Sequence, residues 1–488
     1  MDIISLVFAA LIIFLTLAWL TRKKSDKKSL PGPTGLPFVG YLPFLTKKPY
    51  IKLQELAKKY GPVYKIRLGS VDILVLCDFN IIKEAFAEDA FMGRPADGPF
   101  ELSDETIRTG AFLGLGWKEQ RRFSLHALRD LGFGKTRMEA QLKEEIVEML
   151  ERIEEQRSEP IKISDILASS VSNNIASLLY GSRMKYDDPR RKNLDKLIGN
   201  VGLLAGAVGW QMFFPWARAI MTYLQIGDNG KLSRALEGIK EFSRKEMEEH
   251  EKTLDPNNIR DFMDRYIIEV KKREGQNTGF HREVLLDLAR GFFGAGSTTI
   301  RVSVDWMCLV MAGFPEVQKK IQMEIDDVIG RDRFPTYKDH LQMPYTEAAI
   351  CELMRWKTII PLNLMRSTLE DTELKGYFIP KDMHVLAVLY VPDHDETLWG
   401  KDVHDYKPER FLSKDGKKLI KPEYFIPFST GKRSCPGKPL AEVELFLYFT
   451  AILQKYKISM PPGKKPDFDG ILGIGLEPKK QGLKIEPR

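Results

Sequence analysis

The chain has 488 residues, of which 43% are hydrophobic and 29% charged, and its formal net charge is +7. These values are typical of a globular protein, and no basic stripe with interleaved aromatic residues points to nucleic acid. The four cysteines form no CxxC pair and the seven histidines no HxxxH or HExxH pair, which argues against a disulfide framework, a structural zinc site and a histidine metal centre.

The N-terminal segment has the features of a membrane anchor. Residues 3–20 are uncharged and almost wholly apolar, close to the roughly 20 residues that cross a bilayer. Basic residues follow this run and only Asp2 precedes it, the reverse of a cleavable signal peptide. We therefore predict a transmembrane anchor at residues 1–21, with the rest of the chain in the cytosol.

The remainder divides into a linker and one large domain. Residues 22–48 are basic and then proline-rich, which predicts a stiff extended linker. Residues 49–488 form the predicted domain, mainly α with small β-sheets. Its first elements are a helix over 49–60 and a β-hairpin over 63–76.

Helical periods dominate from about 80 to 330. An amphipathic helix is predicted over 136–157. The apolar stretch 196–226 contains Pro215 and predicts two helices around a break, either a second membrane contact or buried core helices. Residues 281–312 are apolar on nearly all sides, which predicts the longest and most central helix. Strand-like alternation then returns only in 373–391, and the long turn-type segment 392–434 is typical of one that frames a site.

The predicted central helix contains an unusual run of small residues at 294–299, Gly-Ala-Gly-Ser-Thr-Thr. Each glycine inside a helix costs about 1 kcal/mol relative to alanine. The run therefore favours a large flat ligand against the helix or close packing of another helix. Arg301 and Asp305 lie four residues apart on the same helix and are predicted to pair.

Three further patterns place cations near carboxylates or aromatic rings. Glu352 and Arg355 share one helix face, and Arg410 in a Pro-Glu-Arg-Phe run could engage the same carboxylate, since a guanidinium binds carboxylates bidentately. Trp117 and Arg121 lie one helical turn apart.

The stretch 428–437, FSTGKRSCPG, places Cys435 just before a helical pattern. Backbone N–H groups and the helix dipole at such a position favour thiolate over thiol. Gly431 and Gly437 allow close backbone approach and positive φ. The cysteine is either a soft metal ligand or a free thiol in a tight turn.

In this order, the motifs resemble those of the cytochrome P-450 family of haem-thiolate monooxygenases. The stretch 428–437 matches the family's FxxGxRxCxG loop, and ELMR, PERF and WKEQR match its ExxR, PERF and WxxxR motifs. The resemblance covers nearly the whole chain after the anchor. The proline-rich entry resembles microsomal animal enzymes, namely the family-two drug and steroid hydroxylases and their invertebrate relatives.

The resemblance implies the P-450 fold and haem b (iron protoporphyrin IX), with Cys435 as the iron ligand. It implies that the remaining cofactor-binding residues hold the haem propionates (Trp117, Arg121, Arg366 and Arg433), shield the sulfur (Phe428) or lie close to the haem (Gly437 and Ala295). Glu352, Arg355 and Arg410 become a structural network. Thr299 takes the place of the family's oxygen-activating threonine.

One departure from the family pattern lies on the central helix. Thr298 stands where the family has an acid, and a hydroxyl carries no charge and cannot act as an acid near neutral pH. We therefore expect slower or more uncoupled turnover, or a proton relay through water and another residue.

The resemblance also implies partners and a location. Oxygen from O2 would enter a lipophilic substrate by hydroxylation or epoxidation, with electrons from NADPH through a reductase, or from a cytochrome b-type donor, at the endoplasmic reticulum membrane. The segments expected to face the substrate are 98–115, 292–293, 360–362 and 470–477. The cations expected to attract the reductase are Arg122, Arg129, Lys432 and Lys438. Two alternatives are a haem-thiolate isomerase or dehydratase that needs no O2 and a catalytically silent haem protein.

Overall fold

The computed structural model describes residues 29–95, 116–132, 136–204, 210–276 and 278–488. The predicted anchor at residues 1–21, like the first part of the linker, lies outside these ranges. Within them, no helix is both long enough and apolar enough to cross a membrane.

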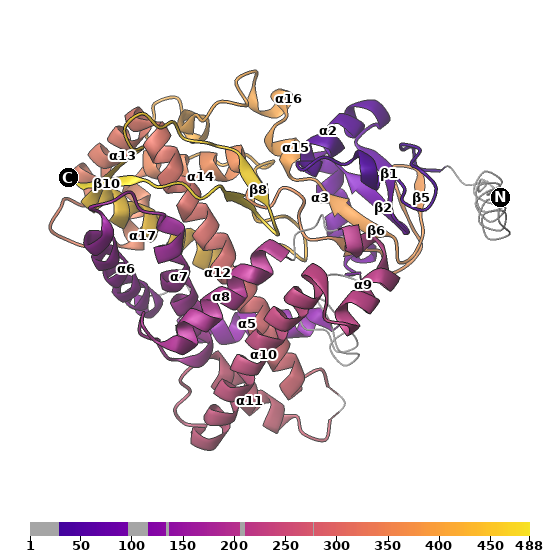
Figure 1. Cartoon of the computed structure of the whole chain (residues 1–488), viewed down its shortest axis with the longest axis horizontal. Helices are drawn as coiled ribbons and strands as arrows, with labels where there is room; N and C mark the ends of the chain where they lie inside the picture. The colour runs from indigo at the N-terminus through magenta and orange to yellow at the C-terminus, as the bar shows by residue number, and fades with distance from the viewer. Residues whose placement is uncertain (1–28, 96–115, 133–135, 205–209, 277) are drawn as a thin grey trace, which may run out of the picture.

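The described helices form most of the molecule, with β1, β2, β5 and β6 on the side of the N-terminus and β10 at the opposite edge beside the C-terminus (Figure 1). The predicted helices at 49–60, 136–157 and 281–312 are confirmed to within a residue at each end. The α-helices are α2 Pro49–Tyr60, α3 Phe79–Ala87, α5 Trp117–Asp130, α6 Thr136–Gln156, α7 Ile163–Tyr180, α8 Pro189–Leu204, α9 Pro215–Tyr223, α10 Gly227–Thr253, α11 Phe262–Lys272, α12 Arg282–Gly313, α13 Pro315–Val328, α14 Pro344–Lys357, α15 Tyr390–Asp393, α16 Glu396–Trp399 and α17 Lys438–Lys455. The 3-10 helices are η1 Leu42–Phe44, η2 Asp89–Phe91, η3 Trp210–Phe213, η4 Tyr337–Gln342 and η5 Pro408–Phe411.

The largest sheet has four strands in the order β1-β2-β6-β3. The predicted hairpin is confirmed: β1 (Val63–Leu68) pairs antiparallel with β2 (Val71–Leu76). β2 then pairs parallel with β6 (His384–Ala387), and β3 (Arg366–Ser367) lies antiparallel at the far edge. This pairing joins residues about 300 positions apart in the chain.

Three two-stranded sheets complete the described β-structure. β4 (Thr372–Leu374) pairs with β5 (Tyr377–Ile379), β7 (Tyr456–Ser459) with β10 (Lys484–Pro487), and β8 (Gly470–Leu472) with β9 (Leu476–Pro478). The expectation that strand-like segments return only in 373–391 is wrong. The later strands β7 to β10 have three or four residues each and pair with one another in two separate two-stranded sheets.

Helix α12 is the longest described helix and runs through the middle of the molecule (Figure 1). Trp306, Val304 and Val310 on it are wholly buried because α7, α8, α10 and α17 pack around it. The Trp306 indole N–H also donates to the Leu476 carbonyl at 2.7 Å. The burial explains why the helix is apolar on nearly every side, as predicted.

The apolar stretch 196–226 forms two helices around a break, as predicted. α8 ends at Leu204, and Pro215 begins α9, where its missing N–H costs no hydrogen bond. α8 buries Leu194, Ile198 and Val201 in the core. α9 differs, since Trp216 is 65% and Tyr223 87% exposed. Of the two alternatives for this stretch, a buried core helix therefore describes α8 but does not describe α9.

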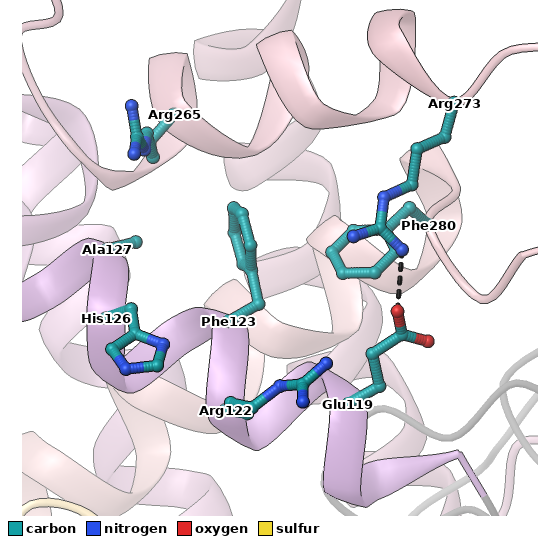
Figure 2. Close-up of a pocket in the computed structure, with 8 residues that line it drawn as sticks. All are labelled: Glu119, Arg122, Phe123, His126, Ala127, Arg265, Arg273 and Phe280. Carbon is teal, nitrogen blue, oxygen red and sulfur yellow. Dashed lines mark hydrogen bonds and ion pairs between the residues drawn. The ribbon is translucent and has the colours of Figure 1, made fainter.

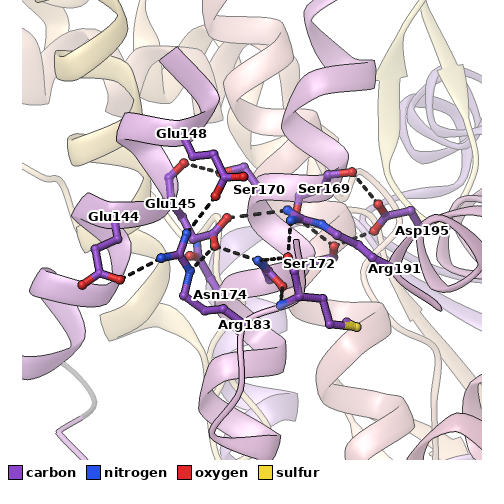
Figure 3. Close-up of polar contacts among 12 residues, drawn as sticks. Glu144, Glu145, Glu148, Ser169, Ser170, Ser172, Asn174, Arg183, Arg191 and Asp195 are labelled. Carbon is purple, nitrogen blue, oxygen red and sulfur yellow. Dashed lines mark hydrogen bonds and ion pairs between the residues drawn. The ribbon is translucent and has the colours of Figure 1, made fainter. Parts of the chain in front are cut away.

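A buried polar network holds α6, α7 and the start of α8 together (Figure 3). Arg191 is wholly buried, donates to the Met184 carbonyl at 2.6 Å and lies 3.6 Å from the Glu145 carboxylate. Asn173 donates to the other Glu145 oxygen at 2.7 Å. Because α8 packs on α12, the network also fixes the position of α8 on the central helix.

Candidate active site

The Cys435 loop lies between the irregular segment after η5 and the start of α17. The Cys435 N–H donates to the Phe428 carbonyl at 2.9 Å, which closes the loop around the half-buried Phe428 ring. Gly431 has φ +74, and a Cβ there would lie 1.9 Å from the Phe86 carbonyl oxygen of α3. The loop therefore has to be glycine at this position because it is pressed against α3.

Gly437 differs from this expectation of positive φ. It caps α17 with φ −84, an ordinary value for any residue. The nearest atom to a Cβ at this position would be the Cys435 sulfur, at 3.8 Å. The described chain therefore gives no steric reason for a glycine here, and the bare backbone leaves space beside the sulfur.

Cys435 is the one exposed cysteine, since Cys77, Cys308 and Cys351 are buried. The Gly437 and Lys438 N–H groups and the Arg121 charge lower its pKa, but burial outweighs them, so the net shift raises the pKa. Protein surrounds most of the thiol, although water still reaches it. The predicted shift toward thiolate is therefore wrong for the protein alone, and a bound metal cation would supply the missing stabilisation.

Four arginines from distant parts of the chain converge beside this loop. Arg121 lies on α5, Arg366 on β3, Arg433 in the loop and Arg94 just after η2. The buried Arg433 donates from Nε to the Met92 carbonyl at 2.7 Å. Arg366 is 1% exposed, with its guanidinium carbon 3.3 Å from the centre of the Phe86 ring.

No carboxylate among the described residues pairs with Arg94, Arg121 or Arg366, and the Nε groups of Arg94 and Arg366 are buried without a hydrogen-bond partner. Burial lowers the pKa of Arg366 and Arg433, and neighbouring guanidiniums lower it further. Buried cations of one sign are costly unless an anion joins them. The cluster is therefore suited to a ligand with more than one negative charge.

Arg94 belongs to this cluster but was missing from the sequence-based set. It donates to the Leu364 and Met365 carbonyls at 2.7 and 2.6 Å. The Ser367 N–H reaches the Gly93 carbonyl at 3.0 Å, which places Arg94 beside β3. The only local signal is an arginine between glycine and proline in an apolar stretch.

The residues fit haem b. A thiol is a soft donor for iron, the space beside Gly437 is free of side chain, and the two propionates would bring the negative charge that the arginines lack. Trp117, 6% exposed, packs against Arg433 and adds an aromatic wall to the cluster.

The predicted Glu352–Arg355–Arg410 network is present behind the loop. Arg355 donates from Nε and Nη2 to the two Glu352 oxygens at 2.7 and 2.8 Å, with both side chains fully buried. Arg410 reaches Glu352 at 3.3 Å and Asp402 at 2.7 Å. The network joins α14 to η5, and none of its members lies in the arginine cluster.

On α12, Ala295 is exposed and its carbonyl accepts a 2.8 Å hydrogen bond from the Thr299 hydroxyl. Thr298 is buried and faces Gly202 of α8. The predicted Arg301–Asp305 pair is wrong, because Arg301 turns to Glu477 of β9 at 2.8 Å. Helical spacing could not reveal a partner from another strand.

The segments expected to face the substrate divide. Phe293 does not face a pocket, because it is wholly buried and stacks on Tyr180, whereas Phe292 is partly buried and packs edge-on against Phe262. The strands around 470–477 do meet the 359–362 segment, since the Leu476 N–H donates to the Ile359 carbonyl at 2.7 Å. Residues 98–115 lie outside the described chain.

The described pocket on the outer side of α5 is separate from the arginine cluster (Figure 2). It has a volume of about 150 Å³ and none of the cofactor candidates lines it. Arg122, His126 and Arg265 surround its opening, and Arg273 pairs with Glu119 at 2.6 Å. This face of α5 is therefore rich in cations.

A mainly helical fold with an exposed thiol beside a cluster of arginines fits a protein that holds a large anionic metal cofactor. The comparisons with known proteins agree: the family model "Cytochrome P450" matches residues 30–485. The chain is 34% identical to cytochrome P-450 18a1 of Drosophila melanogaster (99% of this chain, 92% of the relative). It is 35% identical to cytochrome P-450 2J5 of Mus musculus (98% and 95%) and 33% identical to cytochrome P-450 2A13 of Homo sapiens (98% and 96%).

The chain belongs to the cytochrome P-450 family. It is a microsomal-type haem-thiolate monooxygenase whose cofactor is haem b.

Proposed function

We propose that Cys435 is the iron ligand and that the enzyme oxidises a lipophilic substrate with electrons from NADPH delivered by a reductase. The observation that carries the site assignment is the convergence of Arg94, Arg121, Arg366 and Arg433 on the Cys435 loop, where Arg94, Arg121 and Arg366 pair with no carboxylate of the described chain. These cations would bind the propionates, with Trp117 beside them.

The other residues would then divide between the two faces of the haem. Phe428 would shield the Cys435 sulfur, and Gly437 would leave room for the ring. Ala295 and Thr299 of α12 would lie on the oxygen side, where the Thr299 hydroxyl donates to Ala295 and keeps its lone pairs for a further donor. When bound, the haem supplies the oxygen activation itself.

The proposed substrate class rests on the aliphatic side chains where the segment after α14 meets the turn between β8 and β9. Ile359 and Ile360 abut the turn between β8 and β9, and a Cβ at Gly475 would lie 3.4 Å from the Ile360 side chain. Such aliphatic walls favour an apolar substrate. A screen of lipophilic compounds, read by the spin-state shift of the iron, would identify it.

The activity has a direct test. The reduced protein with carbon monoxide should show the spectrum of thiolate-ligated haem, and reductase with NADPH should then support O2 uptake that depends on substrate. Loss of the thiolate spectrum would refute the site assignment. Turnover without O2 would instead support an isomerase or dehydratase.

The cationic face of α5 is the proposed reductase site. Of the four cations expected to attract the reductase, Arg122 and Arg129 are exposed on one face of α5, Lys438 is exposed at the start of α17, and Lys432 pairs with Asp89 at 2.9 Å. Exposed charges of one sign steer an acidic partner over long range, and salt screens this attraction. Reduction by the reductase should therefore slow steeply as ionic strength rises. A flat response would count against this surface, which a cytochrome b-type donor could share.

Membrane attachment at the endoplasmic reticulum is proposed through the anchor at residues 1–21 and a second contact. The second contact is an exposed apolar surface on and around α9: Trp216, Ile220, Tyr223, Leu224 and Ile226. Patches of this kind mark membrane or protein contacts. Lipid-borne quenchers should reduce Trp216 fluorescence in vesicle-bound protein, with Trp216→Phe as the blank, and unquenched emission would refute the contact.

A further inference from the structure

A carboxylate from another part of the chain lies beside the face of α12 that meets Gly202, and it belongs to no motif found in the sequence. Glu477, on β9, is paired through Oε2 with Arg301 at 2.8 Å. Its other oxygen, Oε1, is buried and has no hydrogen-bond partner. A buried carboxylate oxygen left without a donor is costly, and such an oxygen is able to accept a hydrogen bond from a water or a ligand.

The unpartnered oxygen lies beside the hydroxyls of α12. A Cβ added at Gly202 of α8 would lie 3.6 Å from both Glu477 Oε1 and Thr298 Oγ1. Thr298 Cγ2 would lie nearer, at 3.3 Å, so the space that the absent side chain leaves, which we call the Gly202 hollow, is narrow and both oxygens border it. A neighbouring hydroxyl, that of Ser297, is also buried without a partner.

This position of Glu477 is fixed by the backbone. On one side of it, the Leu476 carbonyl accepts from the Trp306 indole at 2.7 Å, and the Leu476 N–H donates to Ile359 at 2.7 Å. The Ile474 N–H donates to the Gly202 carbonyl at 3.0 Å. The strand, α8 and α12 thus hold the carboxylate in one place, as a positioned proton donor requires.

A series of charged side chains leads from Glu477 toward the surface. Asp305 lies one helical turn beyond Arg301 on α12, and burial raises its pKa to about 7. The groups that face it are Arg301 on its own helix, Glu477 on β9, Asp165 on α7 and Lys480 after β9. The last two are exposed and paired at 2.7 Å, so the series ends in solvent.

We propose that Glu477 is the proton-relay carboxylate of the distal side, held by Arg301 and acting through the hydroxyls of Thr298 and Thr299. Monooxygenation consumes one O2, two electrons and two protons per oxidised substrate and releases one water. In the relay, the Glu477 carboxylate first takes a proton from solvent through Asp305 and then passes it, through a water beside Gly202, to the Thr298 hydroxyl. That hydroxyl releases its own proton toward Thr299, and Glu477 returns to the carboxylate that pairs with Arg301. No group of the relay changes its net charge over a turnover.

The inference rests on the proposed function, and the two fail in different ways. In Glu477→Gln holoprotein with an intact thiolate carbon monoxide spectrum, we expect product formation to fall about tenfold or more and peroxide released per substrate consumed to rise. Glu486→Gln, an exposed carboxylate of β10, is the matched control. Unchanged coupling in Glu477→Gln overturns the relay and leaves the monooxygenase standing, whereas absence of the thiolate spectrum in the wild type overturns the function.

A second variant separates relay from structure. Thr298→Glu in the Glu477→Gln background returns a carboxylate to the hollow and a partner to Arg301, so coupling should recover. If Glu477→Gln does not fold, Glu477→Asp replaces it. This variant keeps the charge but shortens the side chain, so coupling should fall, and unchanged coupling would overturn the relay. A double variant that folds but stays uncoupled overturns the inference.

A third measurement does not depend on turnover. The carboxylate bands of Glu477, isolated as the infrared difference between wild type and Glu477→Gln, should shift when Thr298→Val removes the hydroxyl but keeps the shape. Bands that are the same with and without the hydroxyl overturn the contact on which the relay depends.

Discussion

The guanidinium carbon of Arg433 lies 4.2 Å from the centre of the Trp117 ring. This contact joins the Cys435 loop to the first turn of α5, which also carries Arg121. Aromatic stacking stabilises a guanidinium without neutralising it, so the charge of the cluster persists. The packing therefore adds the Arg433 guanidinium to the cationic cluster beside the loop.

The first prediction concerns the cost of that charge. Arg366→Leu should lower the affinity for haem about tenfold or more, because a charge-assisted hydrogen bond to a propionate is lost. The same change should stabilise the haem-free protein by roughly 1–3 kcal/mol, because a buried cation without a carboxylate disappears. Haem titration and urea unfolding measure the two effects.

The opposite signs make this prediction specific. Arg190→Leu is the control, since Arg190 is exposed and paired with Asp188 at 2.8 Å, and it should change neither quantity by much. If Arg366→Leu weakened the haem-free protein and left haem affinity unchanged, the cluster would be structural.

The second prediction concerns Cys435. Cys435→Ser should abolish the thiolate carbon monoxide spectrum, because an alkoxide ligand is not available near neutral pH. Cys77→Ala is the control: that thiol is buried, burial raises its pKa, and its loss should leave the spectrum intact. A thiolate spectrum that survives in Cys435→Ser would assign the ligand to another cysteine.

Some of this site could be predicted from sequence and some could not. Cys435, Arg433 and Phe428 share one short loop, and Trp117 and Arg121 share one helical turn, so local spacing was enough to find them. Arg94 joins them only because Gly93 pairs with Ser367 across the sheet. The pairing of Gly93 with Ser367 is set by the fold, and the residues near Arg94 in the sequence do not predict it.

The same reasoning applies to α12. Its period identified which residues share a face but not which neighbour each face meets. The prediction therefore placed Phe292 and Phe293 at the pocket, whereas Phe293 is buried in the core of the structure. Arg301 was assigned to Asp305 because the partner on β9 lies 176 residues away.

The third prediction concerns the buried pair Glu352–Arg355. Glu352→Gln should destabilise the protein by about 3–5 kcal/mol, because it leaves Arg355 buried with a neutral partner. Glu55→Gln is the control, since it breaks the exposed Lys52–Glu55 pair and should cost no more than about 1 kcal/mol. Urea unfolding of both variants gives the comparison, and equal midpoints would show that the network contributes little.

The last prediction concerns pH. Glu444 on α17 is fully buried, its Oε1 accepts from Asn174 at 2.9 Å, and its Oε2 has no partner. Burial raises its pKa to about 8, against 4.5 for an ordinary glutamate, although the Asn174 hydrogen bond opposes the shift. Between these two values the folded protein holds a proton that the unfolded chain has released.

Stability from this group is therefore present at low pH and is lost as pH rises toward 8, with a slope of at most about 1.4 kcal/mol per pH unit. Glu444→Gln keeps the acceptor for Asn174 and cannot ionise, so its stability should fall less between pH 5 and 8, and the variant should be the more stable one at pH 8. Glu442→Gln on the same helix, where the carboxylate is partly exposed and lies 3.6 Å from Lys421, should follow the wild type. Urea midpoints at several pH values decide it: parallel curves for Glu444→Gln and wild type would mean that the Glu444 carboxyl does not titrate in this range.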